Sequence, residues 1–196
     1  MSRVGIHRDE RPIFEFEDRV AWERWLEAQH QSSDGVWLKI ARKRAAARTV
    51  TYAEALEEAL RYGWIDGQTA PLDESFWLKR FTPRAPRSKW SQVNRRKATE
   101  LIEQGRMTPA GLAKVEAAKR DGRWEDAYAP PRTATVPEDF QRALDGNPAA
   151  NEFFVTLGGT DRYSFLYRIA DAKRPETRAR RIREYVAMLA EGRTIH

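Results

Sequence analysis

The chain contains no cysteine and only three histidines among its 196 residues. Without cysteine there is no disulfide, no thiolate zinc site and no cysteine nucleophile. The histidines, His7, His30 and His196, lie far apart in the sequence, which disfavours a histidine-based metal centre or a catalytic triad. We therefore expect neither a metal nor a cofactor, and the sequence assigns no catalytic residue.

Long hydrophobic runs are also missing. No window approaches the roughly 20 apolar residues of a membrane-spanning helix, and residues 1–14 lack the apolar core of a signal peptide. We expect no membrane insertion and a cytoplasmic location. Phosphate-binding loops, nucleophile elbows and metal-spaced carboxylates are absent as well, which disfavours the enzyme classes that need them.

What the chain has in excess is positive charge. Its net charge is +6 and its pI about 9.7, which favours acidic partners. The densest part is residues 76–97, FWLKRFTPRAPRSKWSQVNRRK, where eight cations alternate with aromatic residues and no acid occurs. Upstream of this run, the sequence GWIDG at 63–67 carries Asp66, a candidate counter-charge. We expect the basic run to contact something anionic.

Hydrophobic periodicity predicts an α+β fold for the first two thirds of the chain. Asp18 and the capping box Thr51-Tyr52-Ala53-Glu54 each precede a helical pattern. Alternating patterns predict strands over 36–43, 64–69 and 76–82, and helices are expected after Ser88 or Ser91 and after Thr108-Pro109. Residues 1–12 are expected to be frayed. Together these elements predict a small antiparallel β-sheet with packed helices.

A proline-rich stretch separates this part from the rest. Residues 129–136 have the composition of a linker, so we expect an N-terminal α+β domain over 1–128 and a C-terminal domain over 137–196. The C-terminal domain reads as four short helices, one of them capped by Thr160 and the last starting at Pro175. It is expected to be an all-helical module.

The basic run and Asp66 define a candidate ligand site. Its predicted residues are Trp64, Asp66, Arg80, Arg84, Lys89, Trp90 and Asn94. In one interpretation the tryptophans line a pocket and the arginines with Asn94 hold an anionic or polar ligand. In the other, Asp66 forms a structural ion pair with Arg80 or Arg84, and Asn94 satisfies buried backbone groups.

A second basic cluster lies on the predicted last helix. Arg174, Arg178 and Arg181 share one helix face, which suits contacts to phosphates. The alternative is a solvated charged face in which Glu176 and Glu184 pair with these arginines.

Several ordered motifs together resemble one known family. They are Gly63 to Gly67, Arg80 to Arg84 continuing into Ser88 to Ser91, Gly105 to Leu112, and Ala172 to Arg178. With these motifs the chain resembles the YdeI/OmpD-associated, or bacteriocin-protection, family from about Phe14 to Gly192. Arg168 stands where many relatives have a tryptophan. The family names suggest bacteriocin protection or association with an outer-membrane porin, and they imply no reaction or cofactor.

Three functions are consistent with these observations. The first is a non-enzymatic binding protein for an anionic small molecule or an acidic protein partner, with a stress or envelope role as the family names suggest. The second is an enzyme acting on a small polar anion, with Asp66 as acid or base and Arg80 as anion clamp. The third is non-specific nucleic-acid binding, which rests on charge and aromatic residues and lacks a helix-turn-helix or RNA-binding sheet motif.

Overall fold

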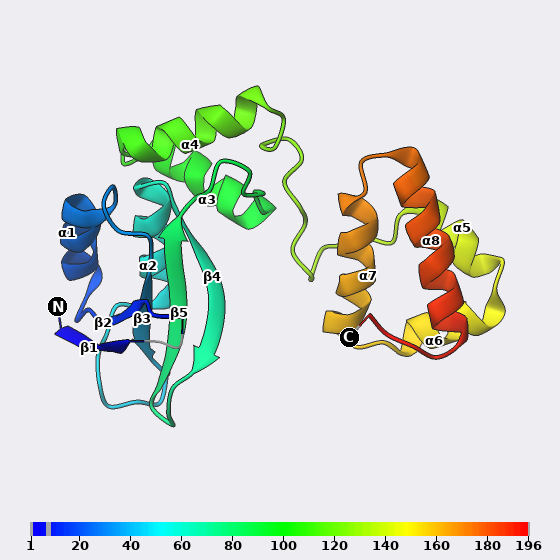
Figure 1. The fold of residues 1–196 in the computed structure, drawn as a ribbon, viewed down its shortest axis with the longest axis horizontal. Helices are drawn as coiled ribbons and strands as arrows, with labels where there is room; N and C mark the ends of the chain where they lie inside the picture. The colour runs from blue at the N-terminus through cyan, green and yellow to red at the C-terminus, as the bar shows by residue number, and fades with distance from the viewer. Residues whose placement is uncertain (1, 7–8, 196) are drawn as a thin grey trace. The chain divides into compact units, whose positions relative to one another are not determined.

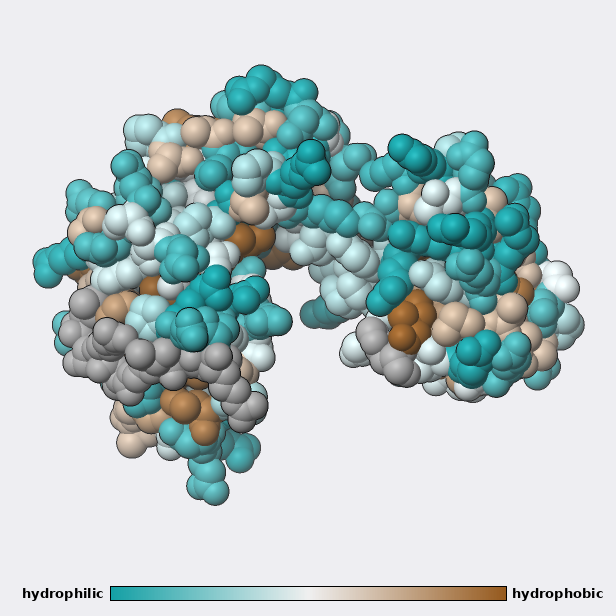
Figure 2. All heavy atoms as spheres, viewed as in Figure 1, coloured by the Kyte–Doolittle hydropathy of each residue, from teal (hydrophilic) through white to brown (hydrophobic). Residues whose placement is uncertain are grey.

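A computed structural model describes residues 2–6 and 9–195 of the chain. The chain divides into two compact units (Figure 1). The N-terminal unit comprises Met1–Trp90 with Asn94–Ala127, and the C-terminal unit comprises Ser91–Val93 with Tyr128–His196. On the face seen in Figure 2, hydrophobic residues form only small, separate areas within a largely hydrophilic surface. Most apolar side chains are therefore used inside the units.

A mostly antiparallel sheet is the centre of the N-terminal unit. In the described part of the chain its strands are β1 (Ser2–Ile6), β2 (Pro12–Glu15), β3 (Val36–Ala41), β4 (Trp64–Pro71) and β5 (Phe76–Pro83), in the spatial order β1-β2-β3-β5-β4. Among the strands that the structure describes, only β2 and β3 pair in parallel. The strands predicted from alternation are confirmed as β3, β4 and β5, and so is the α+β class.

The first two strands were not predicted. The expectation of a frayed segment over 1–12 is wrong for residues 2–6, which form β1 and pair antiparallel with β2. Residues 1, 7 and 8 lie outside the described part. These strands are short, and their hydrogen bonds come from each other and from β3, so pairing with distant segments rather than local propensity creates them.

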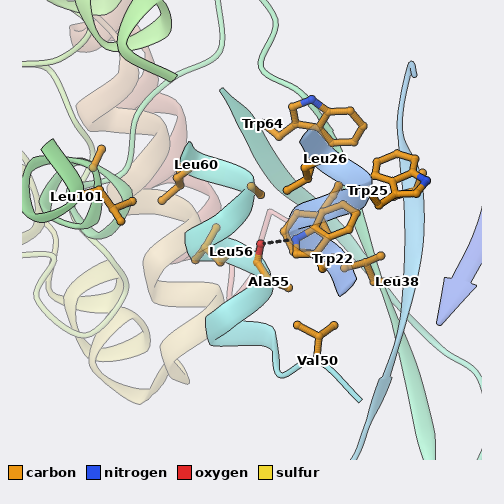
Figure 3. Close-up of a cluster of buried hydrophobic side chains, with 14 of the residues drawn as sticks. Trp22, Trp25, Leu26, Leu38, Val50, Ala55, Leu56, Leu60, Trp64 and Leu101 are labelled. Atoms are coloured by element: carbon orange, nitrogen blue, oxygen red, sulfur yellow. Dashed lines mark hydrogen bonds between the residues drawn. The ribbon is translucent and has the colours of Figure 1, made fainter. Parts of the chain in front are cut away.

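The N-terminal core lies between the sheet and its first two helices, α1 (Arg19–Gln29) and α2 (Tyr52–Arg61). Figure 3 shows the tryptophans of α1 beside α2, with the Trp22 indole donating a hydrogen bond to the carbonyl of Ala55 at 3.1 Å. Trp22 and Trp25 stack with their ring centroids 5.3 Å apart. Both predicted caps are confirmed: Asp18 accepts from the Ala21 amide, and Thr51 and Glu54 form a capping box.

Two further helices, α3 (Gln92–Glu103) and α4 (Pro109–Arg120), complete the sequence of this unit. The GRMTPAGL segment joins them and fixes α4 on the end of α2. The Thr108 hydroxyl donates to the Arg61 carbonyl at 2.6 Å, and a Cβ on Gly111 would lie 2.2 Å from that same oxygen. Gly63 has a positive φ of 74° at the same crossing. Gly63 and Gly111 therefore allow α4 to pack closely against the end of α2.

The C-terminal unit is helical, as predicted. Its helices within the described residues are α5 (Glu138–Asp145), α6 (Pro148–Thr156), α7 (Gly159–Asp171) and α8 (Pro175–Ala190). Their core consists of phenylalanines and aliphatic residues with Tyr185. The predicted cap at Thr160 is wrong: the N-cap of α7 is Gly158, two residues earlier, and the helix begins at Gly159. Glycine satisfies no backbone donor through a side chain, so the sequence carried no capping signal there.

Candidate anion-binding site

Asp66 forms an ion pair inside the N-terminal unit. Its Oδ2 lies 2.9 Å from Nζ of Lys79 and accepts a hydrogen bond from the Tyr52 hydroxyl at 2.9 Å. Lys79 is only 9% exposed and also donates to the Gly67 carbonyl at 2.8 Å. The Lys79 ammonium therefore has two oxygen acceptors close by, and the Asp66 carboxylate neutralises its charge. A structural ion pair was one of the two interpretations, but its partner is Lys79 rather than Arg80 or Arg84.

The strand register explains this choice of partner. Asp66 pairs across the sheet with Phe81, so both side chains lie on the helix-covered face. Lys79, two residues before Phe81, shares that face. Arg80 lies between them in sequence and therefore projects to the opposite face, where its Nη1 lies 3.9 Å from the carboxylate of Asp9. Alternation along β5 separates Arg80 from Asp66.

Asp9 is a polar centre that sequence reasoning missed. Its carboxylate accepts from the Trp37 indole at 2.9 Å and from Arg11 at 2.9 Å, in addition to its distant pairing with Arg80. The only signal was a pair of adjacent acids, Asp9 and Glu10, in a segment expected to be frayed. The structure therefore assigns Arg80 to a small charge cluster on the second face of the sheet.

Trp64 lies in the core. It is 1% exposed, its ring meets those of Trp22 and Trp25 edge-on at 6.4 and 5.7 Å, and its indole donates to the His30 carbonyl at 3.1 Å. Both the indole N–H and the aromatic ring of Trp64 thus already have partners inside the core. Trp64 and Asp66 do not lie together with the other predicted ligand residues at one surface.

The later part of the predicted set does come together. Arg84 is 2% exposed, its guanidinium lies 3.8 Å from the ring centroid of Trp90, and its Nη1 donates to the Lys89 carbonyl at 2.9 Å. Trp90 in turn meets Trp124 edge-on at 4.8 Å. Asn94 is buried one turn further along the chain. Arg84 is thus a cation held in a fixed orientation by a cation–π contact.

Trp90 differs from the other core tryptophans in its polar contacts. The indoles of Trp22 and Trp64 both donate to backbone carbonyls. The buried indole nitrogen of Trp90 has no hydrogen-bond partner among the residues that the structure describes. Buried polar atoms usually have partners, so this nitrogen singles out the surroundings of Arg84 as unusual.

A hollow opens beside Arg84, between the loop at 84–86 and α4. Its volume is about 430 Å³, and we call it the α4 hollow. It is lined by Arg84, Ala85, Pro86, Ala113, Lys114, Ala117, Arg120, Asp121 and Arg123. Four of these side chains are cations and one is a carboxylate. The alanines of α4 have short side chains, so the longer charged side chains form most of the lining of the α4 hollow.

The one carboxylate of the α4 hollow is paired. Arg123 binds both oxygens of Asp121, at 2.8 to 2.9 Å from Nε and 2.7 Å from Nη2, and these hydrogen bonds lower the pKa of Asp121 below its usual value. Another Arg123 nitrogen donates to the Ser88 carbonyl at 2.8 Å, which ties the two sides of the hollow together. The remaining positive charge suits an anion.

Two arginines of the second basic cluster, Arg178 and Arg181, have structural partners. Arg178 binds the carboxylate of Asp139 with two nitrogens and donates a third hydrogen bond to the Ile169 carbonyl at 2.9 Å. Arg181 donates to the Arg168 carbonyl. Both carbonyls belong to the last turn of α7, where cations are favourable. Glu184 pairs with Arg180 at 3.7 Å rather than with the three predicted arginines.

Two kinds of site are absent from the described residues. No His, Asp or Glu side chains gather there in threes that would hold a metal ion. Within the same residues, none of the helices combines the length and the apolar character needed to cross a membrane.

The fold and the site define a two-part α+β protein with a cationic hollow in its sheet-containing unit and a helical module after it. Residues 14–114, more than half of the chain, match the family described as Domain of unknown function (DUF8412), and the chain belongs to this family. Residues 133–192 match Bacteriocin-protection, YdeI or OmpD-Associated, which confirms the resemblance for the helical module. No curated protein and no solved structure matches the chain.

Proposed function

We propose that the protein is a non-enzymatic binding protein for an anionic ligand, which it holds in the α4 hollow. The observation that carries the proposal is Arg84, a guanidinium removed from bulk water, held in place by Trp90 and lining a surface hollow. Burying a cation is costly. An anion in the hollow would offset that cost through charge-assisted hydrogen bonds.

The proposed site keeps part of the predicted set and adds residues from α4. Arg84 binds the ligand, and Trp90 and the Lys89 carbonyl orient Arg84. Asn94, four residues after Trp90 in the chain, is buried. Lys114 and Arg120 lie six residues apart on α4 and line the hollow from the helix. They supply cations that an anion entering from solvent would meet first.

Two kinds of anion fit this site. A small organic acid or phosphate ester is the first, since a hollow of about 430 Å³ is within the usual range for small-molecule sites. An acidic segment of a protein partner is the second, and the family name that matches 133–192 refers to bacteriocin protection and OmpD association. A stress or envelope role is part of this second form of the proposal.

An enzymatic role would need Asp66 as the acid or base. Its Oδ2 accepts from both Lys79 and Tyr52, in an arrangement that neutralises a buried lysine. These contacts favour the structural role of Asp66 and the non-enzymatic form of the proposal.

The test is a charge reversal at the rim of the α4 hollow. We expect the double variant Lys114→Glu, Arg120→Glu to bind pyrophosphate and citrate at least tenfold more weakly than the wild type in isothermal titration calorimetry at low salt, because Coulomb attraction at the site becomes repulsion. Arg84 itself is left intact because its burial makes a substitution there a folding defect.

The matched control is Arg96→Glu, Arg180→Glu. Both arginines are highly exposed, at 73% and 64%, and the double variant has the same net charge as the test variant. We expect it to bind the two probes nearly as tightly as the wild type. Equal weakening in test and control variants would show a general charge effect, and absence of binding to the wild type would contradict the proposal.

A further inference from the structure

A second cationic hollow lies near the turn of the β4–β5 hairpin. Its volume is about 460 Å³, it shares no lining residue with the α4 hollow, and we call it the hairpin hollow. It is lined by Arg42, Lys43, Thr69, Ala70, Pro71 and Trp77. Because β5 lies between β3 and β4, Trp77 lies between the two cations, which follow β3, and the residues of β4.

Trp77 is presented differently from the core tryptophans. Its ring lies 6.0 Å from that of Tyr52, and it pairs across the sheet with Ile40 and Pro71. It is nevertheless only half-buried, whereas Trp22, Trp37, Trp64 and Trp90 are all at most 2% exposed. A partly exposed indole at the edge of a hollow offers a flat apolar surface on which another ring can stack.

The segment that follows β3 adds a row of cations next to this indole. Arg42, Lys43, Arg44 and Arg48 are all exposed, and no acid occurs between Ala41 and Glu54. The Arg42 amide donates to the Ser75 carbonyl at 2.8 Å, which fixes the start of the segment at the hairpin turn. The row extends beyond the hollow, so it can contact more than one phosphate.

The acidic residues closest to the hollow in sequence lie in the hairpin turn, on the other side from the 42–48 segment in the chain. Asp73, in the hairpin turn, accepts hydrogen bonds from the backbone amides of Ser75 and Phe76, each at 2.8 Å, and Glu74 is exposed in the same turn. Further along the sheet, Asp66 is neutralised by Lys79. The side of the hollow next to the 42–48 segment is thus cationic.

We propose that the hairpin hollow binds single-stranded nucleic acid, with one base stacked on Trp77 and the neighbouring phosphates on Arg42, Lys43 and Arg44. Stacking requires an unpaired base whose face is accessible, which a duplex does not offer. The cations beyond the hollow favour a strand with several phosphates over a mononucleotide. This site is independent of the anionic ligand proposed for the α4 hollow.

The experiment is fluorescence anisotropy with a labelled thymidine oligonucleotide of about ten nucleotides at low salt. We expect Trp77→Leu to weaken binding by roughly 5- to 100-fold, the range that loss of one stacked base gives. Trp77→Phe keeps an aromatic face and should retain most of the affinity. Equal losses in Trp77→Leu and Trp77→Phe would overturn the stacking role.

Charge and stacking are then separated with two further variants. Lys43→Glu, Arg44→Glu should weaken binding and reduce the dependence of affinity on salt, because fewer counterions are released. Lys114→Glu, Arg120→Glu, which has the same net charge, should retain oligonucleotide binding. If it loses binding to the same degree, the strand does not bind at the hairpin hollow, and the inference fails while the proposal for the α4 hollow stands.

The choice of probe tests the chemistry of the ligand. An abasic strand of equal length and charge should bind at least about fivefold more weakly than the thymidine strand, because it has no base to stack. Equal affinity for the two strands, or for a duplex of the same length, would overturn the inference. Efficient competition by thymidine monophosphate at concentrations near those of the oligonucleotide would show a mononucleotide site instead and would equally overturn it.

Discussion

The two units bury polar groups in different ways. All of the buried polar or charged side chains among the described residues belong to the N-terminal unit: Thr49, Glu58, Lys79, Arg84 and Asn94. In the C-terminal unit the described core is phenylalanine and aliphatic residues with Tyr185, and the arginines of α8 make their contacts at its surface. The same residue types therefore serve different purposes in the two units.

This difference between the units favours the N-terminal unit as the location of the proposed binding sites. A buried charge is retained only if nearby groups compensate for its loss of hydration, and the compensating groups then fix its position closely. Lys79 with Asp66, and Arg84 with Trp90, are such fixed arrangements. Apolar packing tolerates more substitution. We therefore place both proposed binding sites in the N-terminal unit and regard the contacts of Arg178 as structural.

Tryptophan fluorescence makes the comparison measurable. All seven tryptophans lie in the N-terminal unit, so their fluorescence reports its unfolding alone. Far-UV circular dichroism reports the helices of both units. Comparing the two signals during urea denaturation shows which unit a substitution affects, and whether the expected domains over 1–128 and 137–196 unfold separately.

The largest expected effect comes from Gly111. A Cβ at this position would lie 2.2 Å from the Arg61 carbonyl oxygen, and because that atom is backbone, α4 must move away from α2. We expect Gly111→Ala to lower the free energy of unfolding of the N-terminal unit by about 3 kcal/mol or more, measured by tryptophan fluorescence in urea.

Its matched control is Gly159→Ala in the C-terminal unit. Gly159 begins α7, and no heavy atom lies within 4 Å of a Cβ built there. We expect a change within about 0.5 kcal/mol. If both substitutions had similar effects, the close contact between α4 and the Arg61 carbonyl would not be a determinant of the fold.

Two carboxyl groups, Asp139 in the C-terminal unit and Glu58 in the N-terminal unit, should contribute to the pH dependence of stability with opposite signs. Hydrogen bonds from Arg178 lower the pKa of Asp139 below its ordinary value of 3.8, so the stability it contributes is present above that value and is lost as the pH falls. Burial raises the pKa of Glu58 above its ordinary 4.5, although Arg61 opposes this, so ionisation of Glu58 weakens folding as the pH rises.

Isosteric amides isolate these contributions. Asp139→Asn should cost about 1 kcal/mol of unfolding free energy at neutral pH, because the pair is partly exposed, and the cost should shrink below the ordinary pKa of aspartate. Glu58→Gln should become more stable relative to the wild type as the pH rises above 4.5. Urea titrations at several pH values measure both differences, and a shared sign would contradict the assignment of burial as the dominant influence on Glu58.

Local patterns predicted most of the elements but not their partners. The capping box at Thr51 and the alternation of β3 and β5 are complete within a few residues, so the sequence alone identifies them. The partner of Asp66 depends on strand register, which an irregularity between Asp66 and Thr69 shifts. The alternation of β5 already placed Lys79 beside Phe81, but the pairing with β4 could not be derived from one strand.

The α4 hollow could not be predicted from the sequence, because it too depends on contacts between distant segments. Arg84 was named from the basic run, but Lys114 and Arg120 come from a helix some way further along the chain. Their spacing with Ala117 on one face of α4 was a visible signal of a small-residue surface flanked by cations. Nothing in the sequence showed that this face would lie opposite the loop at 84–86, because long-range packing decides it.

The two units also differ in how their helices are capped, and this difference predicts the smallest effects on stability. In the N-terminal unit α1, α2 and α4 begin with a side chain that accepts a backbone hydrogen bond, whereas among the described residues of the C-terminal unit only Asn147, at α6, does so. Thr51→Ala should therefore cost about 1 kcal/mol by tryptophan fluorescence.

The reverse substitution should stabilise the C-terminal unit slightly. Gly158 is the N-cap of α7, has extended backbone angles, and has open space where a Cβ would lie, so a serine hydroxyl can reach the amide of Asp161 without displacing other atoms. We expect Gly158→Ser to raise the free energy of unfolding by about 0.3 kcal/mol, and Gly158→Ala not to raise it, because alanine lacks an acceptor. Circular dichroism in urea compares the two variants. If serine and alanine behaved alike, α7 would not depend on its first turn, and packing of Phe165 and Ile169 in the apolar core alone would determine its stability.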